Sequence, residues 1–216
     1  METTGIILAG GLSSRMQQNK AFIKVGNQQI IKRIQKELQN VCADLMIVTN
    51  TPEEYLNLGI PTVVDIIPRK GPLSGVHAGL VNSKNYYNLV VACDMPFISQ
   101  RLAEYLLERV PGYAAAVARI GGRPQPLFAV YSKACIEPIE QFLHADRRSI
   151  TRFVEEQKNL LWVEEACVEA LALGNPNTLF LNVNTPQDWA EAQDLVQPTD
   201  ELLENEQPET EHSEKK

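Results

Sequence analysis

Residues 5–20 read Gly-Ile-Ile-Leu-Ala-Gly-Gly-Leu-Ser-Ser-Arg-Met-Gln-Gln-Asn-Lys, and this stretch decides the fold. Its apolar start is typical of a short buried strand, and the adjacent Gly10 and Gly11 end that strand. Glycine has no Cβ, so its backbone can turn through positive φ and let a ligand approach the N–H groups. Arg15 and Lys20 follow, and both side chain types bind phosphate well. The stretch therefore predicts a loop that holds a polyphosphate after the first strand. A plain Gly-Gly turn with two solvated cations is the alternative.

Two common phosphate-binding motifs do not describe this loop. The Walker motif requires Gly-Lys followed by Ser or Thr, and that sequence does not occur in the chain. The dinucleotide-binding motif requires a further glycine three residues after Gly11, where Ser14 stands. The loop is therefore expected to belong to another class of nucleotide-binding proteins.

The composition of the 216 residues predicts one α/β domain over residues 1–196 and an acidic tail over residues 197–216 that we expect to be disordered. The formal net charge of −7 argues against nucleic acid as a partner. No apolar run approaches the ~20 residues that span a bilayer, so no membrane association is expected. The cysteines form no Cys-x-x-Cys pair, which favours a reduced, cytoplasmic setting over disulfides or a zinc site. They are Cys42, Cys93, Cys135 and Cys167.

Strand-like and helix-like patterns alternate along the chain. Strands are predicted at residues 45–48, 62–64, 88–92, 114–120, 127–131, 160–163 and 179–181, with an irregular or edge stretch at Pro124 and Pro126. Helices are predicted at residues 30–38, 99–110, 136–143, 150–154 and 188–196, with a small-residue helix after Gly71. Alternation of this kind predicts a Rossmann-like α/β fold with a mostly parallel, doubly wound central sheet.

Polar residues follow several of the predicted strands. In doubly wound sheets, ligands bind beyond the carboxyl ends of the strands. The Gly10-Gly11 loop, Asp65 and Asp94 each stand at such an end, so we expect them on one rim. Asp94 suits Mg²⁺, which takes one or two protein carboxylates together with phosphate oxygens and water. Asp65 suits hydrogen bonds from a base or ribose. Aspartate also starts turns readily, and that alternative stays open for both residues.

The pattern Leu-Ala-Gly-Gly-x-Ser-x-Arg-Met-x-x-x-Lys over residues 8–20 resembles the signature loop of the molybdenum cofactor guanylyltransferases. These enzymes belong to the wider nucleotidyltransferases with a GT-A-type, Rossmann-like fold. Gly-Pro-Leu-x-Gly at residues 71–75 and Asn-x-Asn-Thr-Pro at residues 182–186 extend the resemblance, which covers about residues 5–196. The usual pattern has Gly and Asp where this chain has Gln17 and Asn19, which raises the question of a lowered or altered activity.

The resemblance implies roles for individual residues. It implies nucleotide contacts from Leu8, Ala9, Gly10, Gly11, Lys20, Asp65 and Asp94, with Asp94 holding Mg²⁺ and with Arg15, Lys20 and Asp94 as the catalytic set. On the acceptor side it implies Asn182 and Asn184, and Arg147 is a further candidate for binding an acceptor phosphate. Helix capping is the alternative for the two asparagines, and a solvated side chain is the alternative for the arginine.

The resemblance also implies the reaction. GMP would pass from GTP to molybdopterin carrying molybdenum, which gives the guanine dinucleotide form of the cofactor and releases pyrophosphate. Proteins that insert the finished cofactor, or molybdoenzymes that accept it, would be the protein partners. Two alternatives stay open. One is a cytidylyltransferase acting on the same pterin, because no single residue indicates which base the nucleotide carries. A non-catalytic nucleotide-binding homologue is the other, motivated by Gln17 and Asn19 and opposed by Arg15, Lys20 and Asp94.

Overall fold

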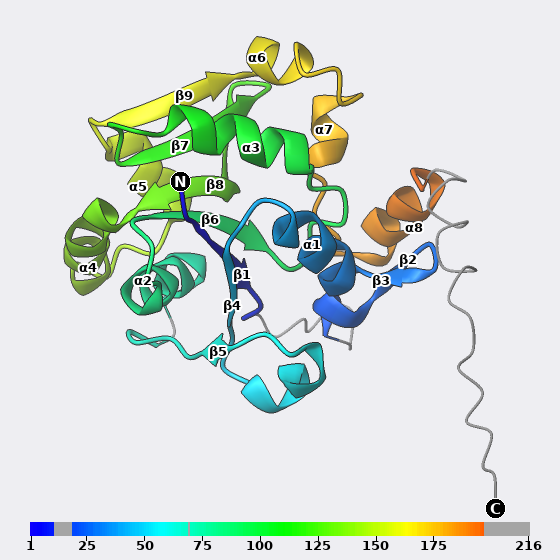
Figure 1. Cartoon of the computed structure of the whole chain (residues 1–216), viewed down its shortest axis with the longest axis horizontal. Helices are drawn as coiled ribbons and strands as arrows, with labels where there is room; N and C mark the ends of the chain where they lie inside the picture. Colours follow the sequence, from blue (N-terminus) through cyan, green and yellow to red (C-terminus); the bar gives the residue numbers. More distant parts are fainter. Residues whose placement is uncertain (11–18, 69, 197–216) are drawn as a thin grey trace, which may run out of the picture.

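The structure is a computed structural model that describes residues 1–10, 19–68 and 70–196 (Figure 1). Within these residues seven strands form one sheet in the order β5-β4-β1-β6-β8-β7-β9. They are β1 (Thr4–Leu8), β4 (Asp44–Val48), β5 (Thr62–Val63), β6 (Tyr87–Ala92), β7 (Ala115–Ile120), β8 (Arg123–Ser132) and β9 (Leu160–Glu164). Only β8 runs antiparallel to its neighbours β6 and β7, and the other pairings are parallel. The predicted α/β fold with a mostly parallel sheet is confirmed.

Helices cover both faces of this sheet (Figure 1). The core on one face takes side chains from α1 (Ile30–Gln39), α3 (Gln100–Arg109), α6 (Glu165–Glu169), α7 (Pro176–Leu179) and α8 (Pro186–Asp194). The core on the other face takes them from α2 (Pro72–Asn82), α4 (Ile136–His144) and α5 (Ile150–Glu156). Short 3-10 helices are η1 (Lys20–Phe22), η2 (Pro52–Leu58) and η3 (Lys133–Cys135), and β2 (Lys24–Val25) pairs with β3 (Gln28–Gln29) as a small hairpin. None of the helices in the described ranges is long and apolar enough to cross a membrane.

The strand β1 supplies both cores because successive side chains of a strand point to opposite faces. Ile7 is buried in the core with α1, whereas Ile6 and Leu8 are buried in the core with α2. On the α2 side the approach is close. A Cβ on Gly79 would stand 2.7 Å from Ile6 Cγ2, so glycine at this position lets α2 lie directly on the strand.

Some predicted elements are wrong. The predicted strand at residues 179–181 does not form, because Leu179 is the last residue of α7 and a non-regular connection to α8 follows. Leu179 and Phe180 are nevertheless buried in the core, and a run of three apolar residues does not distinguish a strand from the end of a helix. The sequence also predicts a short extended piece at residues 21–25, but Lys20–Phe22 forms η1 and only Lys24–Val25 is a strand, β2.

The strand β8 begins four residues earlier than the predicted start at Leu127 and lies between β6 and β7 rather than at an edge. Its pairing with β6 starts only at Phe128, and its register with β7 shifts between Val117 and Arg119. The prediction of an irregular stretch around the two prolines is therefore confirmed. The predicted tail, residues 197–216, lies outside the described residues.

Candidate active site

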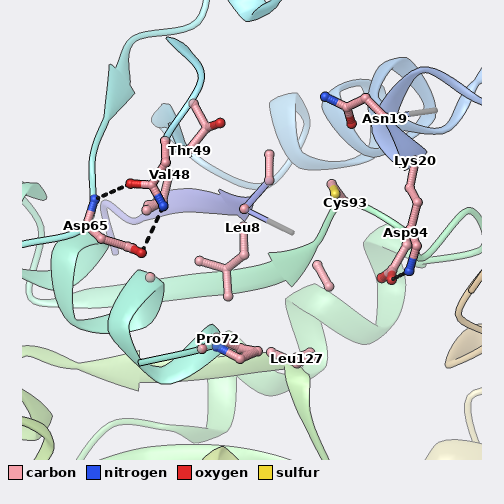
Figure 2. A pocket seen from close by; sticks show the side chains of 16 residues that line it. Leu8, Asn19, Lys20, Val48, Thr49, Asp65, Pro72, Cys93, Asp94 and Leu127 are labelled. Atoms are coloured by element: carbon pink, nitrogen blue, oxygen red, sulfur yellow. Dashed lines mark hydrogen bonds and ion pairs between the residues drawn. The ribbon is translucent and has the colours of Figure 1, made fainter. Parts of the chain in front are cut away.

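A pocket opens beyond the carboxyl ends of β1, β4, β5 and β6 (Figure 2). Parallel pairing continues past these ends. The Ala9 N–H donates to the Val48 carbonyl over 2.8 Å, and the Cys93 N–H donates to the Leu8 carbonyl over 3.0 Å. The pocket-lining residues are Leu8, Ala9, Gly10, Asn19, Lys20, Val48, Thr49, Asn50, Asp65, Gly71, Pro72, Gly75, Ala92, Cys93, Asp94 and Leu127. Segments far apart in the sequence thus meet at one rim of the sheet.

A lysine–aspartate pair forms one side of the pocket, as Figure 2 shows. Lys20 Nζ lies 3.4 Å from Asp94 Oδ2 and also donates to Asn184 Oδ1. Lys20 stands at the start of η1, where Asn19 Oδ1 accepts a hydrogen bond of 3.1 Å from the Ala21 N–H. Burial raises the pKa of Asp94 above its ordinary value, although the charge and the hydrogen bond of Lys20 lower it. The pair therefore holds a carboxylate in a place that penalises its charge.

The other carboxylate oxygen, Asp94 Oδ1, is buried and has no hydrogen-bond partner among the described residues. A buried acceptor without a hydrogen-bond partner costs free energy. This oxygen is therefore suited to contact a bound ligand. In the described ranges no group of three or more His, Cys, Asp or Glu side chains could hold a metal ion. Among the described residues Asp94 would thus share a cation with at most one further side chain of these types, which fits a hard divalent cation that takes its other oxygens from phosphate and water.

The opposite side of the pocket carries Asp65 (Figure 2). Asn50 Nδ2 donates to Asp65 Oδ2 over 3.1 Å, and the Asp65 N–H donates to Asn50 Oδ1 over 3.4 Å. These two bonds orient the carboxylate on the loop that follows β5. Apolar atoms of Leu8, Pro72 and Leu127 lie between the two polar sides. The pocket therefore suits an elongated ligand with hydrogen-bond donors at one end and anionic oxygens at the other.

The structure brings most of the predicted nucleotide-contacting residues to this one pocket. Leu8, Ala9, Gly10, Lys20, Asp65 and Asp94 all line it. Gly11 and Arg15 lie outside the described residues. The ligand contacts and catalytic roles given to this whole set stay predictions.

The three predicted acceptor-side residues do not all lie at the pocket. Asn184 reaches the pocket through its bond to Lys20. The Asn182 side chain instead donates to the Phe180 carbonyl over 2.9 Å. Arg147 pairs with Glu156, and its guanidinium carbon lies 3.9 Å from the centroid of the Phe142 ring. Neither Asn182 nor Arg147 lines the pocket, and the acceptor role of all three stays a prediction.

The segment around Asn184 caps a helix and also contacts the site. Asp188 accepts hydrogen bonds of 2.8 Å from the N–H groups of Asn184 and Thr185, and the Thr185 hydroxyl accepts from the Asp188 N–H. Burial alone would raise the pKa of Asp188, but these backbone donors lower it. In the same segment the Val183 N–H donates to the Asp94 carbonyl over 2.8 Å. The cap of α8 is thus fastened to the loop that carries Asp94.

Several residues of the pocket were not predicted from the sequence. Thr49 and Cys93 follow β4 and β6, so their position after a predicted strand is a usable signal. Burial, followed by the neighbouring Asp94 charge, raises the pKa of Cys93 to about 12, so this group stays a thiol and is a poor nucleophile. Leu127 carried no such signal, and Gly75 was noted only as part of the Gly-Pro-Leu-x-Gly segment at residues 71–75. Asn50 carried the same signal as Thr49, because both follow the predicted strand at residues 45–48.

Comparisons with known proteins identify similar chains. The family described as the MobA-like NTP transferase domain matches residues 5–160. A probable molybdenum cofactor guanylyltransferase of Pelotomaculum thermopropionicum is 43% identical over 91% of this chain and 95% of its own length. One of Clostridium perfringens is 43% identical over 66% of this chain and 72% of its own. The crystal structure of molybdopterin-guanine dinucleotide biosynthesis protein A from Archaeoglobus fulgidus shares the fold, with a TM-score of 0.74 at 21% identity over 88% of this chain and 97% of its own.

Proposed function

The chain belongs to the family of MobA-like NTP transferase domains, and we propose that it transfers GMP from GTP to molybdopterin carrying molybdenum. The products are the guanine dinucleotide form of that cofactor and pyrophosphate. One observation carries this proposal: the Lys20–Asp94 pair and Asp65 lie on opposite sides of a single pocket at the carboxyl edge of the sheet (Figure 2). Relatives named molybdenum cofactor guanylyltransferase at 43% identity support the choice of reaction.

The two sides of the pocket suit the two ends of GTP. The guanine base carries N–H donors, and Asp65 is an acceptor held in place by Asn50. The triphosphate carries negative charge, and Lys20 is a cation at the other side of the pocket. The backbone of Gly10 has no Cβ to hinder a phosphate, and a Cβ built there would meet no atom of the described residues closer than 4.0 Å.

The chemistry requires positioning and charge stabilisation. An oxygen of the acceptor's terminal phosphate attacks the α-phosphorus of GTP and forms a new P–O bond. The bond from that phosphorus to the bridging oxygen breaks, and its electron pair leaves with pyrophosphate. A phosphate oxygen is already anionic near neutral pH, so no protein group has to remove a proton. Lys20 stabilises negative charge on the phosphates, and Arg15 is proposed to do the same.

A divalent cation fits this site, and we propose Mg²⁺ held by Asp94. When bound, Mg²⁺ would neutralise phosphate charge and help to orient the triphosphate. The protein's contribution is the buried carboxylate itself, whose Oδ1 has no partner among the described residues. The bond from the Val183 N–H to the Asp94 carbonyl keeps the loop of that carboxylate in place.

Asn184 is proposed to face the acceptor, since its amide oxygen accepts from Lys20 beside the phosphate end of the pocket. Proteins that insert the product into molybdoenzymes, or the molybdoenzymes themselves, are proposed as partners. We also propose a cytoplasmic location. All four cysteines are free thiols, which suits a reducing compartment.

Pyrophosphate release tests the proposed reaction. Purified protein is incubated with molybdenum-loaded molybdopterin, Mg²⁺ and either GTP or CTP. We expect release with GTP that depends on the pterin and is at least tenfold slower with CTP. Faster release with CTP would identify a cytidylyltransferase, and binding of GTP without any release would identify a non-catalytic homologue.

Two lysine variants, compared by GTP titration, provide a matched test of the nucleotide site. Lys20→Ala removes the cation that lines the pocket and should weaken GTP binding at least tenfold. Lys24→Ala removes an exposed lysine that does not line this pocket, and it should bind GTP as the wild type does. Equal weakening in both variants would indicate an effect of net charge alone.

A further inference from the structure

The two described residues that flank the glycine-containing loop in the sequence are joined through one side chain. Ala9 precedes Gly10, and Asn19 precedes Lys20. The Tyr55 hydroxyl donates to the Ala9 carbonyl over 3.4 Å and accepts from Asn19 Nδ2 over 2.8 Å. Tyr55 belongs to η2, a segment distant in sequence from both. We call these two hydrogen bonds the tyrosine bridge.

The environment of the tyrosine bridge keeps the Tyr55 hydroxyl protonated. Tyr55 is fully buried, and burial raises the pKa of its hydroxyl to about 12, so the group remains protonated and can donate. A phenol oxygen can donate one hydrogen bond and accept others, and both capacities are used here. The Tyr55 ring also packs on the Phe22 ring of η1, with ring centroids 5.1 Å apart. The residue therefore contacts η1 through the ring and through the hydroxyl.

Asn19 transmits this restraint to Lys20. Its Oδ1 caps η1 by accepting from the Ala21 N–H, while its Nδ2 bonds to Tyr55 and, over 2.6 Å, to Glu54 Oε2. Fixing the Asn19 side chain therefore fixes the first turn of η1, and Lys20 is the first residue of that turn. At the other side, Ala9 leads directly into Gly10, so both pocket-lining neighbours of the loop are restrained by one hydroxyl.

We propose that the Tyr55 hydroxyl is a positioning group for the nucleotide triphosphate. It holds Gly10 and Lys20 in register at the phosphate end of the pocket without touching the ligand, so its loss weakens nucleotide binding more than it weakens the fold. The inference rests on the proposed function in so far as the nucleotide is GTP.

The side-chain amide of Asn19 belongs to the same hydrogen-bond network. With Glu54 Oε2 only 2.6 Å from Asn19 Nδ2, an aspartate at this position would place two carboxylates in contact. The amide instead donates to both Glu54 and Tyr55. Asn19 is therefore matched to Glu54 in this chain, and this match is a physical reason why asparagine stands where the related pattern has aspartate.

The first test compares two tyrosine variants of the full chain. Tyr55→Phe keeps the buried ring and removes the bridge. Tyr87→Phe is the matched control. The Tyr87 hydroxyl lies at the end of β6 that is far from the pocket, and it accepts a 3.0 Å hydrogen bond from the Gly112 N–H. GTP affinity with Mg²⁺ is measured by titration calorimetry, and hydrogen exchange of the Ala21 and Ile23 amides is measured without nucleotide.

For Tyr55→Phe we expect a GTP dissociation constant raised about tenfold, exchange at the η1 amides at least fivefold faster, and a melting temperature lowered no more than in Tyr87→Phe. The control should change neither GTP affinity nor η1 exchange. GTP affinity within twofold of the wild type, or unchanged η1 exchange, would overturn the inference. If the wild type itself binds no GTP, the proposed function fails, and the exchange arm alone decides whether the bridge orders η1.

A second set of variants does not depend on the folding of Tyr55→Phe. Asn19→Asp should weaken GTP binding by more than the tenfold expected for Tyr55→Phe, because the new carboxylate cannot donate to Tyr55 and also meets Glu54. Glu54→Gln alone should bind GTP within twofold of the wild type, and the double variant should recover to the affinity of Tyr55→Phe. Recovery is expected because the new glutamine amide can donate to the new carboxylate. A double variant that binds GTP as weakly as Asn19→Asp would overturn the role given to the Asn19–Glu54 contact.

Discussion

At the scale of single residues, Asp94 combines a structural cost with a proposed function. Its Oδ2 faces Lys20, and its buried Oδ1 has no partner among the described residues. Asp94→Asn keeps the shape and removes the charge that a hard cation requires. We expect a folded variant, with an unchanged circular-dichroism spectrum, that releases less than a hundredth of the wild-type pyrophosphate from GTP at any Mg²⁺ concentration. Normal turnover would remove Asp94 from the mechanism, because asparagine caps turns as well as aspartate does.

The effect of Asp94→Asn on the free energy of unfolding is expected to depend on pH. Burial raises the pKa of Asp94 above its ordinary value of 3.8 in the folded protein, in spite of Lys20. The folded protein therefore holds this proton to higher pH than the unfolded chain does, so the Asp94 contribution to stability falls as pH rises through that interval. Asparagine does not titrate. The free energy of unfolding of Asp94→Asn, minus that of the wild type, should thus increase between about pH 3 and pH 7. Urea denaturation across this range measures it, and a difference that is constant or decreases would contradict the account.

At the scale of elements, the close packing of α2 on β1 depends on glycine. A Cβ on Gly79 would stand 2.7 and 2.8 Å from two carbons of Ile6, a fully buried and β-branched side chain. Gly79→Ala gains helix propensity but forces the helix or the strand to move. We expect a net loss of about 1 to 2 kcal/mol in the free energy of unfolding.

Gly75→Ala is the control one helical turn earlier. There the nearest atom is Leu8 Cδ2 at 3.1 Å, the end of a more flexible side chain, so we expect a smaller loss of stability. Both variants are compared by urea denaturation. Equal losses would show that the contact with Ile6 is not what distinguishes the two positions.

Elements with strong patterns were predictable from the sequence, and elements defined by tertiary contact were not. The helix α1 was found because its buried residues recur at helical spacing, from Ile30 to Leu38. The parallel strands were found because both faces are covered, which leaves continuous apolar runs. The predicted strand at residues 179–181 was wrong because a short apolar run is buried equally well at the end of a helix.

The same distinction applies to the site. Asp65 and Asp94 were found because strand ends share one edge of a parallel sheet. The tyrosine bridge was not found, because a single tyrosine 36 residues away from Asn19 leaves no local pattern. Nor does the sequence indicate that the segment capping α8 reaches Asp94 through Val183, since that bond joins two segments far apart in the sequence.

At the scale of the whole molecule, α8 fastens the β2–β3 hairpin to the domain. Trp189 Nε1 donates to the Lys24 carbonyl over 2.8 Å, and Gln193 both donates to that carbonyl over 3.2 Å and accepts from the Gly26 N–H over 2.8 Å. A Cβ on Gly26 would stand 3.0 Å from Val196 Cγ1, so the chain still packs on the hairpin at residue 196. The hairpin directly follows η1, which carries Lys20. Residues near 190 therefore support an element of the site that lies near residue 20.

This arrangement predicts where the chain can be shortened. The domain is expected to end at residue 196, because the following residues are polar, acidic and without apolar periodicity. Truncation after Val196 should therefore change the melting temperature by less than about 2 °C. Truncation after Pro186 removes the three hydrogen bonds that Trp189 and Gln193 make to the hairpin. At about 1 kcal/mol for each bond, and about 2 to 4 °C for each kcal/mol, the melting temperature should fall by about 6 °C or more. Differential scanning calorimetry of both truncated chains measures the contrast. A large fall on truncation after Val196 would show that residues 197–216 stabilise the domain, against the predicted boundary.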